Sequence, residues 1–118
     1  MNKYQIMQNR RDARNLIRIS NRNKDCFKWS SNESDAHIHR KLEICKWLKK
    51  QGKEFYTEGI FDLGNGRFDI LNSDDLIIYE VTETETKESM EEKKRKYPEL
   101  FEVIFVSASV EWDEKLIL

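Results

Sequence analysis

The stretch that decides the fold spans residues 67–82 and reads RFDILNSDDLIIYEVT. Residues 76–82 form an almost continuous apolar run, which is typical of a central strand buried on both faces. Residues 67–71 predict a second strand, and the polar sequence at 72–75 predicts a short turn between the two. Each predicted strand carries one carboxylate among apolar neighbours, Asp69 in the first and Glu80 in the second.

The flanking segments add three further elements to these strands. Residues 54–63 are an aromatic-rich extended run, and the following Gly64-Asn65-Gly66 favours a type I′ hairpin turn. Residues 84–97 predict a surface helix that ends at a proline, and residues 101–106 predict a last strand. A strand–helix–strand crossover of this length predicts that the last strand runs parallel to residues 76–82.

Two helices are predicted before the strands. Residues 36–50 place Ile38, Leu42 and Leu48 on one side, after a cap at Ser34 or Asp35. Residues 4–19 predict a basic amphipathic helix. Residues 1–40 carry nine Lys and Arg against four Asp and Glu, so this arm is either a phosphate-binding surface or a solvated basic face. The residues expected to contact phosphates are Arg10, Arg11, Arg14 and Arg18.

Composition limits the class of protein. A chain of 118 residues with 38% hydrophobic and 11% aromatic residues predicts one folded domain, with a basic helix and loop at 1–35 and a core at 36–118. No apolar stretch approaches the roughly 20 residues of a membrane span. Cys26 and Cys45 fit neither a metal motif nor a disulfide framework, which favours a reduced, cytoplasmic or otherwise intracellular setting.

The order helix, three strands, helix, strand resembles the core of the PD-(D/E)XK nuclease superfamily, which includes restriction endonuclease-like and small Holliday-junction-resolvase-like proteins. Asp69 and Glu80 resemble the two strand carboxylates of that family, and Glu43 resembles its helix acid. The resemblance covers about residues 36–107. It implies a three-layer α/β core with a mixed central sheet, to which this chain adds an N-terminal helix.

The resemblance also implies a catalytic role for Glu43, Asp69 and Glu80 as ligands of Mg²⁺ or Mn²⁺ in a DNA endonuclease. Hard cations take oxygen ligands, and a bound metal lowers the pKa of its water so that hydroxide attacks the phosphodiester. A lone carboxylate in an apolar strand is costly unless it is paired or metal-bound, which makes Glu80 the strongest candidate. Asp69 can instead be a hairpin surface residue, and Glu43 can instead pair with a lysine of its own helix.

The sequence departs from the family at Thr82, which stands where the resemblance implies a catalytic lysine. Lys46 and Lys87 are candidate substitute cations by position. Without such a cation, cleavage is expected to be slow or absent, because a hydroxyl carries no charge to stabilise the phosphorane. Arg67 is expected either to contact a phosphate or to pair across the hairpin with an acid such as Glu58.

Two further interpretations stay open beside the endonuclease. One is a non-catalytic nucleic-acid-binding module that retains the nuclease fold, and the other is a small regulatory domain of viral or mobile-element origin. The resemblance also implies a homodimer, because one site addresses one strand of a duplex.

Overall fold

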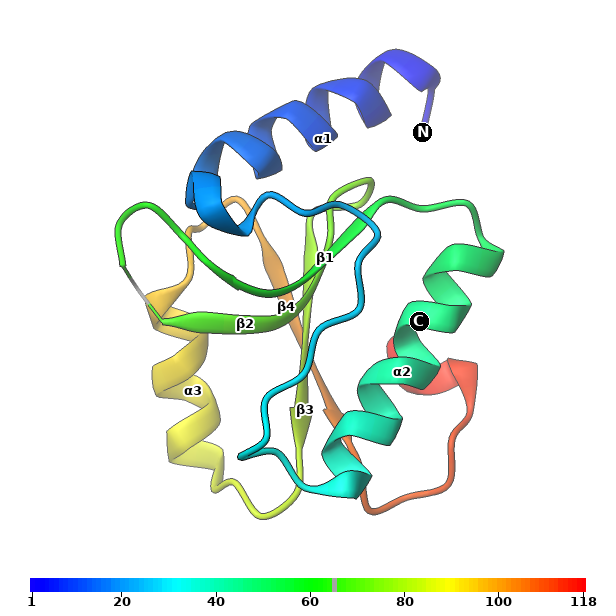
Figure 1. Ribbon diagram of the computed structural model, residues 1–118, viewed down its shortest axis with the longest axis vertical. Coiled ribbons are helices and arrows are strands. Elements are labelled where there is room, and N and C mark those ends of the chain that lie inside the picture. The colour runs from blue at the N-terminus through cyan, green and yellow to red at the C-terminus, as the bar shows by residue number, and fades with distance from the viewer. Residues whose placement is uncertain (65) are drawn as a thin grey trace.

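The computed structural model describes residues 1–64 and 66–118 and shows an α/β fold with one four-stranded mixed sheet. The predicted order of helices and strands is confirmed (Figure 1). The elements are α1 (Lys3–Leu16), η1 (Ile19–Asn21), α2 (Asp35–Lys50), β1 (Phe55–Ile60), β2 (Arg67–Asn72), β3 (Ile77–Thr82), α3 (Lys87–Lys96), β4 (Glu102–Ser107) and η2 (Glu114–Ile117). The predicted type I′ turn centres on residue 65 and lies outside the described residues.

The sheet has the strand order β1-β2-β3-β4. β1 and β2 pair antiparallel, and so do β2 and β3. β4 pairs parallel to β3 along its whole length, as the crossover through α3 predicts. The pairing of β2 with β3 stops at Ile70 and Tyr79, although both strands continue past that point. β2 and β3 are therefore not paired by backbone hydrogen bonds before Ile70 and after Tyr79.

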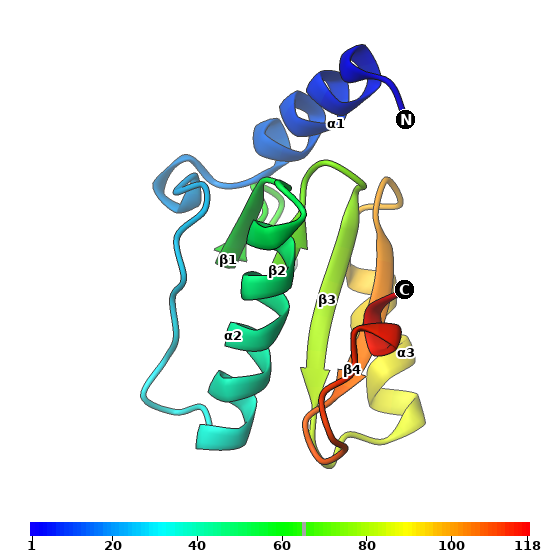
Figure 2. The ribbon, with the colours of Figure 1, turned by 90° about the vertical axis from the view of Figure 1, so that its right-hand side faces the viewer.

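The helices cover the two faces of the sheet. Figures 1 and 2 show α2 on one side and α3 on the other, with α1 across one end. α2 buries Ile44 and Leu48 against Ile70, Tyr79 and other strand residues. The other face is built largely from aromatic side chains packed with α1, namely Tyr56, Phe61, Phe68, Tyr97 and Phe101. The site described below therefore lies between two separate apolar clusters.

α1 is joined to the core rather than held apart from it. Its Ala13 and the following Ile17 are fully buried in the aromatic cluster, and Ile17 pairs with Phe61 in an isolated β-bridge. The helix ends before this bridge because Ile17 adopts an extended conformation, so it is shorter than the 4–19 segment predicted. Residues 1–35 thus contribute side chains to the same core as residues 36–118.

Side-chain caps set the starts of the other helices. The Ser34 hydroxyl accepts a hydrogen bond from the His37 N–H and begins α2 one residue before the predicted helix. Thr86 does the same for Ser89, so α3 begins three residues later than predicted. α3 has no buried residue, in agreement with the predicted surface helix. Among the described residues, no helix is long and apolar enough to cross a membrane.

Candidate active site

The candidate site lies where β2 and β3 diverge. There, the side chains of Asp69 and Glu80 accept hydrogen bonds from backbone N–H groups in place of backbone pairing between the strands. The Asp69 N–H donates to Glu80 Oε2 at 3.2 Å, and the Val81 N–H donates to Asp69 Oδ2 at 2.8 Å. The two acids lie on neighbouring antiparallel strands, as the short turn predicts. Because the strands no longer pair here, alternation does not hold both side chains to one face. The short turn predicts that both carboxylates lie on the same side of the sheet and face α2. Asp69 does so and contacts His37, but Glu80 faces α3, so the prediction is wrong for Glu80.

Glu80 is enclosed on the α3 side of the sheet. Its side chain is 1% exposed, its Oε1 bonds the Tyr97 hydroxyl, and Lys93 Nζ lies 3.6 Å from its Oε2. Burial, and then the neighbouring Asp69 charge, raise the pKa of Glu80 well above its ordinary value. A protonated Glu80 can donate to the Tyr97 oxygen while the Tyr97 hydroxyl donates to the Arg67 carbonyl at 3.1 Å. The surroundings of Glu80 thus favour its neutral form.

Asp69 has the opposite behaviour, because its surroundings favour the ionised form. Burial alone would raise its pKa, but contacts with His37, Glu80 and the Val81 N–H outweigh burial and lower the pKa to about 2. Two adjacent carboxyl groups with pKa values pushed apart are an arrangement that acid–base chemistry uses. The structure thus favours the ionised form of Asp69 and the neutral form of Glu80.

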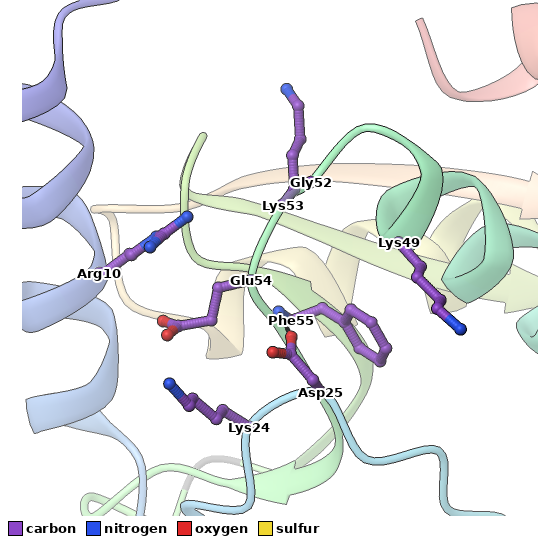
Figure 3. Close-up of a pocket in the computed structure, with 8 residues that line it drawn as sticks. All are labelled: Arg10, Lys24, Asp25, Lys49, Gly52, Lys53, Glu54 and Phe55. Carbon is purple, nitrogen blue, oxygen red and sulfur yellow. Dashed lines mark hydrogen bonds between the residues drawn. The ribbon is translucent and has the colours of Figure 1, made fainter.

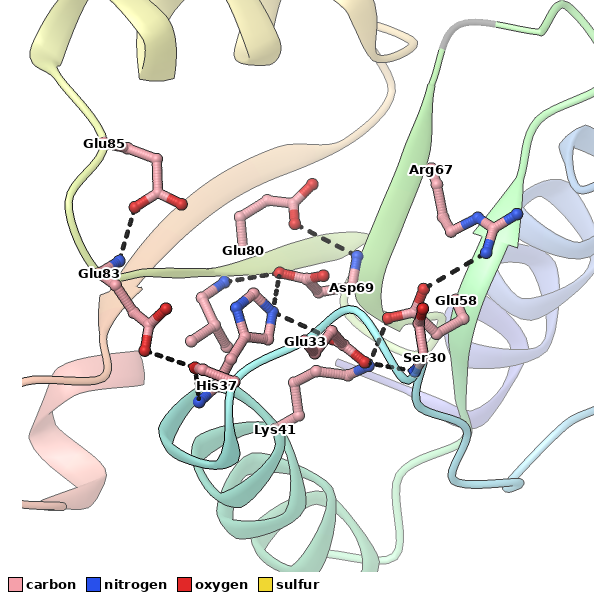
Figure 4. Close-up of polar contacts among 12 residues, drawn as sticks. Ser30, Glu33, His37, Lys41, Glu58, Arg67, Asp69, Glu80, Glu83 and Glu85 are labelled. Carbon is pink, nitrogen blue, oxygen red and sulfur yellow. Dashed lines mark hydrogen bonds and ion pairs between the residues drawn. The ribbon is translucent and has the colours of Figure 1, made fainter.

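Glu33 and His37 complete a group of possible metal ligands with Asp69 (Figure 4). His37 Nε2 lies 3.2 Å from Glu33 Oε1 and 3.4 Å from Asp69 Oδ2, but within the described residues this buried nitrogen has no well-directed hydrogen bond. The Asp69 carboxylate raises the pKa of His37 although burial lowers it. The ligand atoms of the three residues lie within 4.8 Å of one another, so this group can hold a metal ion.

A buried lysine balances the acids on the α2 side. Lys41 is fully buried, and its Nζ contacts Glu33 at 3.0 Å, Glu58 and the Lys28 carbonyl. Burial raises the pKa of Glu58, and the contact with Lys41 opposes that shift. Glu58 also has a φ of 51°, in the left-handed region that costs a non-glycine residue about 1–3 kcal/mol. Glu58 therefore combines a strained backbone conformation with a carboxylate that contacts Lys41.

Glu43 does not join this group, which corrects the expectation from the sequence. Its Oε1 accepts a hydrogen bond from Arg40 Nε at 3.0 Å, and its side chain lines a pocket with Trp47 and Trp112. Six helical positions separate Glu43 from His37, which rotates it about 240° around the helix. α2 therefore cannot present both residues to Asp69.

The expected cations also lie elsewhere. Lys46 lines the same pocket as Glu43, and Lys87 is exposed at the start of α3, so neither contacts Asp69 or Glu80. Thr82 is half-buried beyond Glu80 and pairs with Ser107 of β4. The cation that does reach Glu80 is Lys93.

The basic residues of the predicted phosphate surface divide into two kinds. Arg10 forms a two-pronged ion pair with Asp74, at 2.6 and 3.0 Å, so it fastens α1 to the sheet. Arg11, Arg14 and Arg18 are exposed. Arg67 is mostly exposed, and its Nη1 lies 3.8 Å from Glu58 Oε2. Glu58 is the cross-hairpin partner predicted as one alternative for Arg67.

A separate cavity of about 290 Å³ lies beside α1, and Figure 3 shows its lining. Three of its charged groups are already satisfied: Arg10 by Asp74, Lys53 by Asp75, and Asp25 by the Phe55 N–H. This cavity is remote from the paired acids and does not share their chemistry.

Sequence reasoning missed Glu33, His37, Lys41, Lys93 and Tyr97. One signal existed for two of them. His37 and Lys41 precede Ile44 and Leu48 at helical spacing, so they continue the buried stripe of α2 towards the polar end of the sheet. Glu33 lies in an irregular loop and Lys93 on a helix without a buried face, so neither follows a pattern.

Comparison of the chain with family models, with curated proteins and with solved structures gave no match. The PD-(D/E)XK resemblance accordingly remains a prediction that depends on the residues themselves. The α/β class and the mixed sheet come from the structure.

Proposed function

We propose that this chain is a metal-dependent endonuclease-like protein with a restriction endonuclease-like core, whose centre is formed by Asp69 and Glu80 and whose substrate is DNA. The observation that carries the proposal is the pair of adjacent buried carboxyl groups with opposite pKa shifts at the point where β2 and β3 diverge. A purely structural sheet has no need of two acids there, because apolar side chains would pack at lower cost. The order of elements and the parallel β3–β4 pair support the same interpretation.

Asp69 would hold a divalent ion together with Glu33 and His37 on the α2 side of the sheet, while Glu80 would act on the α3 side, next to Lys93 and the Asp69 N–H. Carboxylates suit Mg²⁺, and the imidazole makes Mn²⁺ an equally good fit. Such an ion supplies a hydroxide at neutral pH and neutralises charge on the phosphodiester. Binding also requires a neutral His37, so affinity should fall as pH drops through its raised pKa.

Lys93 would provide the charge that Thr82 lacks. Its ammonium lies 3.6 Å from Glu80 Oε2 on the α3 side and is about half exposed, so it can approach a substrate phosphate that reaches this side of the gap between β2 and β3. A cation in this position stabilises the negative phosphorane, and loss of one such group typically costs about 10²–10³ in rate.

The test combines metal binding with cleavage. Mn²⁺ binding by calorimetry and cleavage of linear and branched DNA would be measured for the natural sequence, Asp69→Asn and Lys93→Gln. Asp69→Asn should lose both properties. Lys93→Gln should keep metal binding and lose about 10²-fold or more in cleavage rate, while the exposed neighbour change Lys94→Gln should alter neither.

The departure at Thr82 favours one alternative, a non-catalytic nucleic-acid-binding or regulatory module. In that case the protein would bind DNA, but neither Mg²⁺ nor Mn²⁺ would give cleavage at any pH. A homodimer stays a prediction, and sedimentation of the chain with and without DNA would test it.

A further inference from the structure

A second site lies on the outer face of α2, away from the paired acids. A cavity of about 330 Å³ opens between this helix and the segment that leads into η2. It is lined by Glu43, Lys46, Trp47, Lys50, Trp112 and Glu114. This volume is within the range of small-ligand sites, and two indole rings with a few charged groups are the kind of lining that such sites use.

The indole rings are held in place by polar contacts. Trp47 Nε1 donates to Glu114 Oε2 at 3.2 Å. The Arg40 guanidinium lies 5.6 Å from the centre of the Trp112 ring, within the range of a cation–π contact. Arg40 itself is buried and donates to the carbonyls of Ser107 and Val110. The aromatic walls are therefore organised before any ligand arrives, which reduces the entropic cost of binding.

The charges of the cavity are unequally satisfied. Glu43 is paired with the Arg40 guanidinium, whereas Glu114 accepts from the neutral Trp47 indole and keeps its charge. Lys46 and Lys50 are exposed, and within the part of the chain that the structure describes neither forms an ion pair. The cavity thus offers two ammonium groups, against the unneutralised carboxylate of Glu114, beside aromatic surfaces.

We propose that this cavity binds an unpaired nucleotide of a single-stranded nucleic acid, with the base against Trp112 and the phosphate at Lys46 and Lys50. Aromatic surface recognises any base by stacking, and nearby lysines follow the backbone. A nucleotide matches both features, whereas a simple anion would leave the indoles unused. The proposal is independent of catalysis, since binding at this site needs neither metal nor Asp69.

The experiment separates stacking from general attraction to phosphate. Binding of a labelled ten-residue oligothymidylate is compared with binding of an abasic strand of the same length, by fluorescence anisotropy in EDTA. The natural sequence should bind the thymidylate strand about tenfold or more tightly than the abasic strand. Trp112→Leu should remove most of this ratio, and Trp29→Leu, which alters an exposed tryptophan elsewhere, should leave it unchanged.

A second pair of variants avoids any risk to folding. Lys46→Glu with Lys50→Glu changes only exposed side chains and should weaken binding of the thymidylate strand, whereas Lys49→Glu on the same helix should not. Equal affinity of the natural sequence for both strands would overturn the proposal. So would a ratio that survives Trp112→Leu or that depends on Trp29.

Discussion

Replacement of Glu80 by glutamine should stabilise the metal-free protein while it abolishes any metal-dependent activity. Glu80 is 1% exposed, and burial together with Asp69 raises its pKa well above 4.5. Above pH 4.5 the folded protein therefore keeps a proton that the unfolded chain has released. Stability of the natural sequence must then fall as pH rises from 4.5 to the folded pKa, by up to about 1.4 kcal/mol per pH unit.

A glutamine at position 80 avoids this loss because its amide never ionises. The amide oxygen can accept the Asp69 N–H, and the amide nitrogen can donate to the Tyr97 oxygen, so the contacts of the protonated glutamate are kept. The difference in unfolding free energy between the variant and the natural sequence should grow by about 1.4 kcal/mol per pH unit across that window. The variant should be the more stable protein at pH 7.

Urea denaturation in EDTA at pH 5, 6 and 7 would measure this difference. Glu92→Gln, on the exposed face of α3, is the matched control and should show no such trend. Added Mn²⁺ should stabilise both proteins, because the possible ligands Glu33, His37 and Asp69 are unchanged in the variant. A constant difference, or a less stable variant at pH 7, would refute the assignment of a stored proton to Glu80.

Three further predictions address other parts of the fold. Gly59→Ala should cost about 1–3 kcal/mol in urea denaturation, because a Cβ there would collide with the Phe68 ring. Lys41→Met should cost about 3–5 kcal/mol at pH 7 and less at pH 4, because burial raises the pKa of Glu58, which is protonated more readily once Lys41 is absent. Substitution of the exposed arginines in and just after α1 by alanine should weaken DNA binding and reduce the slope of log affinity against log salt by up to about 3, as measured by anisotropy. These arginines are Arg11, Arg14 and Arg18.

Local patterns in the sequence were sufficient for the order of elements and for the position of the two strand acids. The apolar run at 76–82 and the turn at 72–75 fix β3 next to β2, and this places Asp69 beside Glu80. The crossover length fixes the direction of β4. Both inferences work because they depend on neighbouring residues and on the geometry of the backbone.

The rotation of α2 could not be predicted in the same way. Its apolar arc is wide, and the sequence favoured a face that includes Leu42, which is 38% exposed in the structure. Leu48 is buried as predicted, and the buried face also contains Lys41 and Ile44. A buried lysine is rare without partners, and its partners Glu33 and Glu58 come from a loop and another strand, so only the tertiary structure could assign Lys41 to the interior. The same rotation moved Glu43 away from Asp69.

Several energetically unfavourable features gather around Asp69 and Glu80, and they support a functional centre there. Lys41 and Glu80 are both almost fully buried, and Glu58 adopts a strained backbone conformation within the same network. Folding alone gains little from such an arrangement, since a buried ion pair often stabilises no more than apolar residues of similar volume. His37 Nε2 adds a buried nitrogen whose contacts lack hydrogen-bond direction. Departures from stable packing that gather around one acid pair are what a ligand-binding or catalytic site requires, because a bound ion would satisfy the carboxylates and the imidazole together.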